Sequence, residues 1–142
     1  MKVEFYDAAD DKSLKFAVIV ARKAGKWVFC RHKARNTLEI PGGHREAGEA
    51  ISDAARRELY EETGAISYSM KPVCFYSVAA SDADEKTFGA LFYAEIAETE
   101  AVLHSEIESV QLLDELPSMW TYPQIQPLLI EEAKRRGFIS RF

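Results

Sequence analysis

The sequence predicts an α/β (α+β) fold, a sandwich in which helices pack against a β-sheet. Two observations lead to this class. Segments rich in β-branched and aromatic residues stand on both sides of a helix-forming segment, which gives the order strands, helix, strands, helix. The chain has 142 residues, of which 47% are hydrophobic and 29% charged, as in one ordinary globular domain. We therefore expect a single domain over residues 1–142.

The first expected strands form a hairpin. Leu14 to Arg22 is rich in β-branched residues, residues 23–26 contain the glycine of a turn, and Trp27 to Arg31 supplies the returning strand. A basic, irregular stretch follows, and then a short apolar run, Leu38 to Ile40, which a proline and two glycines stop. Further strands are expected over residues 67–79, 87–97 and 107–113.

Two helices are expected. Residues 49–63 are strong helix formers, and Gly64 follows at the position of a C-terminal helix cap. Residues 122–136 predict a closing helix, whose last turn places basic side chains at the negative end of the helix dipole.

Charge and composition narrow the classes of partner. Eighteen Lys and Arg against 23 Asp and Glu give a net charge of −5, which argues against nucleic-acid binding. No apolar run approaches the roughly 20 residues that span a bilayer, and the first residues lack the apolar core of a signal peptide. Cys30 and Cys74 lie in apolar stretches, as buried free thiols do in reducing compartments. We therefore expect a cytoplasmic protein with no membrane association, either a monomer or a homodimer.

The first predicted helix carries carboxylates on its apolar face. On a helical wheel the apolar residues form an arc of roughly 140°. Glu58 and Glu62 fall inside that arc, and Glu61 lies just outside its edge. Burying unpaired carboxylates together costs several kcal/mol and makes them repel one another, unless a positive group lies among them. The arc is defined by Ile51, Ala54, Ala55 and Leu59.

A divalent metal ion would remove this conflict. Glutamates at i, i+3 and i+4 project from adjacent turns of one face, as oxygen coordination of Mg²⁺ or Mn²⁺ requires. The alternative is a solvated face in which Arg56 and Arg57 form salt bridges with these glutamates. Arg57 can also hold Glu61, its i+4 neighbour, without occupying the metal site.

The segment before this helix is rich in glycine. Three glycines occur within seven residues, from Gly42 to Gly48. Glycine lets a backbone approach a ligand closely, and amides that lead into a helix N-terminus suit phosphate oxygens. Together with the carboxylates, this segment indicates a site for a metal-bound polyphosphate.

Residues 43–65 resemble the signature box of the Nudix hydrolases. They read G-x5-E-x7-R-E-L-x-E-E-x-G-A. The last box position is usually a bulkier aliphatic residue than Ala65, which affects packing and not the metal site. Leu38 likewise stands where many relatives carry an aromatic residue.

The resemblance implies a fold, an activity and a ligand set. The fold is the Nudix α/β/α sandwich, with a mixed β-sheet between helices. The activity is hydrolysis of a nucleoside diphosphate linked to another moiety, by metal-activated water attack at phosphorus, with Mg²⁺ (or Mn²⁺) as cofactor. The resemblance makes Glu58, Glu61 and Glu62 metal ligands and Arg57 the residue that orients a glutamate. Glu49 and a carbonyl of Gly42 or Gly43 would assist in binding the metal.

Such sites often need one more carboxylate from outside the box, as a metal ligand or base. We expect Glu106, which directly precedes the predicted strand 107–113, to supply it. Glu108 and Glu85 are the competitors.

Substrate contacts are predicted from residue type alone. Arg31 and Lys33 belong to a locally basic stretch that could meet terminal phosphates, or simply cap a strand. Trp120 and Tyr122 lie in a predicted loop, where they could stack on a nucleobase. Aromatic residues of the predicted strands could also stack, although packing in the core is the alternative for them: Phe75, Tyr76 and Phe88. His44 lies at a variable box position near the expected phosphates, and His32 carries no local signal.

The expected substrate is a small-molecule nucleotide. The chain lacks the proline and the tyrosine that mark the ADP-ribose and dinucleoside-polyphosphate subfamilies after the box. This favours a nucleoside triphosphate, such as 8-oxo-dGTP in the MutT-like branch, cleaved to the monophosphate and pyrophosphate. Hydrolysis of ADP-ribose, nucleotide sugars or dinucleoside polyphosphates stays open, as does a non-catalytic nucleotide sensor. An isomerase of isoprenoid diphosphates fits poorly, because both cysteines fall in predicted strands.

Overall fold

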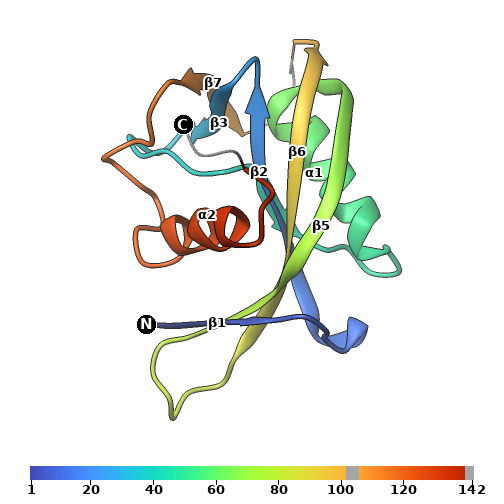
Figure 1. Cartoon of the computed structure of the whole chain (residues 1–142), viewed down its shortest axis with the longest axis vertical. Helices are drawn as coiled ribbons and strands as arrows, with labels where there is room; N and C mark the ends of the chain where they lie inside the picture. Colours follow the sequence, from blue (N-terminus) through green and yellow to red (C-terminus); the bar gives the residue numbers. More distant parts are fainter. Residues whose placement is uncertain (102–105, 140–142) are drawn as a thin grey trace.

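The computed structural model of the chain describes residues 1–101 and 106–139. Within them, seven strands form one mixed sheet in the order β1-β5-β6-β2-β3-β7, with β4 paired to β2 (Figure 1). β2 runs parallel to β6, whereas the other pairings are antiparallel. The strands are β1 (Lys2–Tyr6), β2 (Leu14–Lys23), β3 (Lys26–His32), β4 (Gly42–His44), β5 (Ala65–Ala79), β6 (Thr87–Thr99) and β7 (Ile107–Leu113).

The two helices cover opposite faces of this sheet. They are α1 (Ile51–Thr63) and α2 (Gln126–Arg135), and a short 3-10 turn, η1 (Asp11–Ser13), precedes β2. Side chains alternate along a strand, so Ile19 of β2 packs in the cluster below α1, while Val20 packs in the cluster below α2. The result is the predicted α/β/α sandwich with a mixed sheet.

Several element boundaries differ from the sequence prediction. The predicted helix 49–63 begins at Ile51, after Ala50 in an extended conformation. The predicted helix 122–136 begins only at Gln126, because residues before Pro127 form a turn. The expected glycine loop contains β4, which pairs Gly43 with Ala17 of β2.

β4 fixes where the site lies. A Cβ at Gly42 would lie 2.6 Å from the Ala17 carbonyl oxygen and 2.8 Å from the Val18 Cα, so the two backbones meet there without room for a side chain. Ile19 N–H also donates to the Pro41 carbonyl at 2.9 Å. This pairing holds the chain that leads into α1 against the middle of the sheet.

Candidate active site

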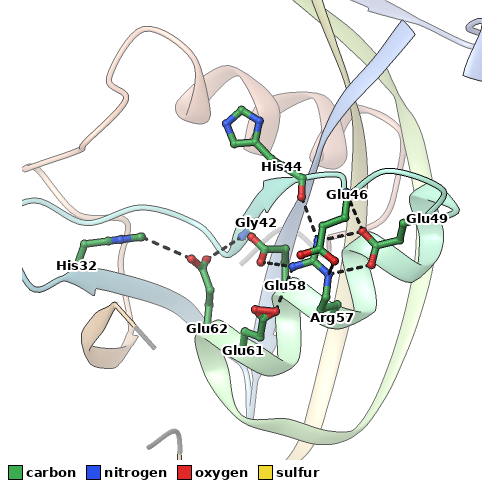
Figure 2. Close-up of polar contacts among 9 residues, drawn as sticks. All are labelled: His32, Gly42, His44, Glu46, Glu49, Arg57, Glu58, Glu61 and Glu62. Carbon is green, nitrogen blue, oxygen red and sulfur yellow. Dashed lines mark hydrogen bonds and ion pairs between the residues drawn. The ribbon is translucent and has the colours of Figure 1, made fainter. Parts of the chain in front are cut away.

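Arg57 is the centre of an ion-pair network on α1 (Figure 2). Its guanidinium donates to Glu49 through Nε at 2.8 Å and Nη2 at 2.9 Å. Its Nη1 donates to Glu58 at 2.9 Å and to Glu61 at 3.0 Å. Its Nη2 also donates to the His44 carbonyl at 3.0 Å. One cation therefore orients three carboxylates and joins α1 to the end of β4.

The carboxylates differ in exposure as the helical wheel predicts. The side chains of Glu58 and Glu62 are 13% and 11% exposed, whereas that of Glu61 is 37% exposed. The Arg57 hydrogen bonds lower the pKa of Glu49 to about 2. Burial raises the pKa of Glu58 to about 7, although Arg57 acts against this shift. Burial likewise raises the pKa of Glu62 to about 8, against the hydrogen bond from Gly42.

β4 meets both buried carboxylates. Gly42 N–H donates to Glu62 Oε1 at 2.9 Å. A Cβ on Gly43 would overlap Glu58 Oε2, so the Glu58 carboxylate occupies the space that any other residue at position 43 would need. The glycines thus bring backbone groups against the acidic face of α1.

Sequence reasoning missed a second contact of Glu62. His32 Nε2, at the end of β3, lies 3.5 Å from Glu62 Oε2 and 3.3 Å from Glu39 Oε2. Glu39 is only 7% exposed although it stands in the apolar run 38–40. The signal in the sequence was a carboxylate within an apolar run, just as Glu58 is a carboxylate within the apolar arc of the first predicted helix.

A cavity of about 440 Å³ opens beside β4, on the α2 side of the sheet. Gly42, Gly43 and Tyr122 line it together with Tyr76, one of the strand aromatics that could stack on a base, and with Gln126, which the sequence did not indicate. Gln126 Oε1 accepts a hydrogen bond from Ile40 N–H at 2.8 Å. The amide N–H groups of Gln126 are therefore donors at the wall of the cavity.

The other predicted substrate residues lie away from this cavity lining. Trp120 packs edge to face on Phe29, with ring centroids 5.3 Å apart. Arg31 Nη1 donates to the Arg35 carbonyl at 3.1 Å. Lys33 is exposed.

The carboxylates predicted from outside the box lie in three places. The Glu106 carbonyl accepts from Lys33 N–H at 2.9 Å, which places the Glu106 backbone beside the end of β3, next to His32. Glu108 is exposed on β7, and Glu85 lies in the turn between β5 and β6.

The donor set fits a hard divalent cation. Glu58, Glu61, Glu62 and Glu49 supply carboxylate oxygens, which Mg²⁺ and Mn²⁺ prefer. Burial raises the pKa of Glu58 and Glu62, the two most buried of the four, so their ionised forms are incompletely stabilised in the metal-free chain. Across residues 1–101 and 106–139, no three acidic, histidine or cysteine side chains already converge closely enough to hold a metal ion.

The fold, the box of residues 43–65 and the glutamates of α1 occur together in one class of enzyme. A match to a family model leads to the same class. The NUDIX domain matches residues 11–136, and the chain belongs to this family. It is a Nudix pyrophosphohydrolase, and enzymes of this family generally use divalent metal cations.

Particular relatives cover nearly the whole chain. A Bacillus subtilis (strain 168) protein named "Putative 8-oxo-dGTP diphosphatase YtkD" is 28% identical over 150 residues, 99% of this chain and 93% of the relative. The crystal structure of a mutant of the Bacillus subtilis pyrophosphohydrolase BsRppH has a TM-score of 0.78 and 26% identity, covering 97% of this chain and 93% of that one.

A more distant neighbour shares the fold. The NUDIX domain of Shewanella oneidensis NrtR, solved in complex with ADP ribose, has a TM-score of 0.67 and 16% identity over 90% of this chain and 93% of its own.

Cys30 and Cys74 are buried and free, as the sequence predicts. None of the helices in the described ranges is long and apolar enough to cross a membrane.

Proposed function

We propose that the chain hydrolyses a nucleoside triphosphate to the nucleoside monophosphate and pyrophosphate, with Mg²⁺ as the cation. The observation that carries this proposal is the pair of buried carboxylates, Glu58 and Glu62, held against the glycines of β4. Such a pair is unfavourable in a purely structural role and suits a site where a cation and phosphates bind.

The proposed ligands are Glu58, Glu61 and Glu62, with Glu49, the Gly42 carbonyl and Glu106 as further donors. When bound, Mg²⁺ would neutralise the phosphates and lower the pKa of a coordinated water. Arg57 aligns Glu49, Glu58 and Glu61 before the substrate arrives. Glu106 is the proposed carboxylate from outside the box.

The cavity beside β4 is the proposed place of the nucleoside. Tyr122 and Tyr76 offer aromatic surface, and the Gln126 amide offers a donor to a nucleobase acceptor. Arg31 and Lys33 remain the proposed contacts of the terminal phosphates. Trp120 is a weaker candidate for stacking, because its indole already packs on Phe29.

The name of the Bacillus subtilis relative supports an oxidised nucleotide such as 8-oxo-dGTP as the substrate. We also propose that residues 1–142 form one Nudix domain, since both core clusters share one sheet. The two buried free thiols support a cytoplasmic location.

A substrate panel tests the proposal. 8-oxo-dGTP, dGTP, ADP-ribose, a nucleotide sugar and a dinucleoside polyphosphate are incubated with the protein and Mg²⁺, and both products are identified. We expect pyrophosphate and a monophosphate from a triphosphate, and no turnover in EDTA until Mg²⁺ is restored. Preferred cleavage of ADP-ribose, or turnover that EDTA leaves unchanged, would contradict it.

A further inference from the structure

One imidazole nitrogen separates two buried carboxylates on the side of Glu62 away from Arg57. His32 Nε2 lies 3.3 Å from Glu39 Oε2 and 3.5 Å from Glu62 Oε2. The exposed fraction is 20% for the His32 side chain and at most 11% for either glutamate side chain. Figure 2 shows the imidazole approaching Glu62 from β3, opposite the glycine strand.

Each carboxylate is anchored through its other oxygen. Glu39 Oε1 accepts from Arg35 Nη1 at 3.0 Å, and the Glu39 backbone exchanges two hydrogen bonds with Cys30, at 2.8 and 3.0 Å. Glu62 Oε1 accepts from Gly42 N–H at 2.9 Å, and the Cys30 thiol donates to the Glu62 carbonyl at 3.5 Å. The free oxygen of each carboxylate therefore faces His32.

The imidazole is poised between its two partners. Among residues 1–101 and 106–139, Nε2 is buried and has no partner that satisfies hydrogen-bond geometry. It lies at ion-pair distance from both carboxylates, so a small rotation directs its N–H to either one. Without a donor here, two buried like charges would face each other, and one carboxylate would turn away or take up a proton.

We propose that His32 is a positioning residue, which, with Glu39 as its counterpart, holds the Glu62 carboxylate in the orientation that binds a divalent cation. The arrangement follows the way in which hydrogen-bonded partners orient metal-binding side chains elsewhere. The inference rests on the metal role of Glu62 in the proposed function, and it assigns no contact between His32 and the substrate.

The test measures binding of Mn²⁺ alone, without substrate, by isothermal titration calorimetry. His32→Gln keeps an amide donor near the position of Nε2, whereas the amide of His32→Asn is too short to reach it. We expect His32→Asn to weaken Mn²⁺ binding by about 10–100-fold and His32→Gln to recover most of it. Lys26→Ala, at the exposed other end of β3, is the matched control and should bind as the parent does.

Parental Mn²⁺ affinity in His32→Asn would overturn the inference, as would equal losses in the Asn and Gln variants. Thermal unfolding of each metal-free variant shows that it is folded at the titration temperature. If His32→Asn does not fold, His32→Ala takes its place in the comparison with His32→Gln.

Two further variants distinguish a failure of this inference from a failure of the proposed function. Glu62→Gln that binds Mn²⁺ as tightly as the parent would refute the metal assignment in the proposed function. Glu62→Gln that loses Mn²⁺ while His32→Asn retains it would refute only the role of His32. Glu39→Ala should weaken binding in the parent and not in His32→Asn, because Glu39 acts through the imidazole. Equal losses in both backgrounds would exclude Glu39 as the counterpart.

Discussion

The two helices each carry a buried glutamate near their C-terminal end, and the surroundings of these two carboxylates differ sharply. Glu132 on α2 is 7% exposed and accepts hydrogen bonds from Arg135 and Arg136, which lower its pKa to about 2. Glu62 on α1 is 8% exposed as a whole residue, and its carboxylate accepts one backbone hydrogen bond, from Gly42 N–H. Burial outweighs this hydrogen bond and raises the pKa of Glu62 to about 8.

Glu132 has the surroundings of a structural carboxylate, whereas Glu62 has those expected of the proposed metal ligand. Two guanidinium groups compensate Glu132, and its charge ties the end of α2 together. Glu62 instead faces Glu39 across His32 and has Glu58 nearby, so its negative charge is incompletely compensated. Burial alone therefore does not identify a site; burial without a matching cation does.

Glu62→Gln should give the largest effect. We expect the turnover number to fall by more than about 100-fold, because the proposed ligand loses its charge. Steady-state kinetics with the best substrate of the panel, at saturating Mg²⁺, measures this. Glu132→Gln is the control on the other helix and should keep parental turnover. An equal loss of turnover in Glu132→Gln would show that the two buried glutamates do not differ in their importance for catalysis.

Arg57→Ala should reduce turnover by about 10–100-fold, because Glu49, Glu58 and Glu61 lose the cation that aligns them. Arg56→Ala, one residue away and exposed, is the matched control. Equal rates for the two alanine variants would show that the network does not support catalysis.

The unfolding free energy should depend on pH in opposite directions at the two glutamates. Folding lowers the pKa of Glu132 to about 2, so its stabilisation is present above the unfolded pKa near 4.5 and is lost as the pH falls towards 2. Glu132→Gln should then cost about 1–2 kcal/mol at pH 7 and progressively less in acid. Urea unfolding at several pH values measures this; a constant difference would contradict it.

For Glu62 the sign is reversed. Folding raises its pKa to about 8. The protonated carboxyl therefore stabilises the metal-free folded state fully below the unfolded pKa of about 4.5, and this stabilisation is lost as the pH rises through 8. Glu62→Gln should remove part of this decline. If the metal-free parent and Glu62→Gln lose stability in parallel between pH 5 and 9, the charge of Glu62 is compensated after all.

The smallest expected effect is a pH dependence of the stabilisation by Mg²⁺. Glu58 and Glu62 must both be deprotonated to bind a cation, and burial raises the pKa of each, to about 7 and about 8. Mg²⁺ should therefore raise the melting temperature by more at pH 8.5 than at pH 6. Differential scanning fluorimetry compares the two shifts, and Glu62→Gln should show little shift at either pH.

Local periodicity was enough to predict the acidic face of α1. Glu58 and Glu62 fall within the apolar arc because the helix is regular, and their burial follows directly. The box also located the chain in its family. The second set of contacts could not be found in this way, because His32 and Glu62 are 30 positions apart in the sequence and meet only through the packing of β3 against α1.

The remaining differences also have physical causes. Gly42 and Gly43 predict a turn by residue type, but their lack of side chains is what allows β4 to lie against β2. Trp120 resembles an exposed loop aromatic in the sequence, yet a bridge between Leu38 and Trp120 brings it onto Phe29. Tertiary pairing decided both outcomes.

Position 43 has a consequence for how such a protein can diverge. Because the Glu58 carboxylate fills the space of the absent Cβ, one added methyl group at position 43 would displace that acid, and it would do so at a residue that also lines the cavity beside β4. A single codon change at this position would thus alter the acidic face of α1 and the cavity wall together, so the two cannot diverge independently there.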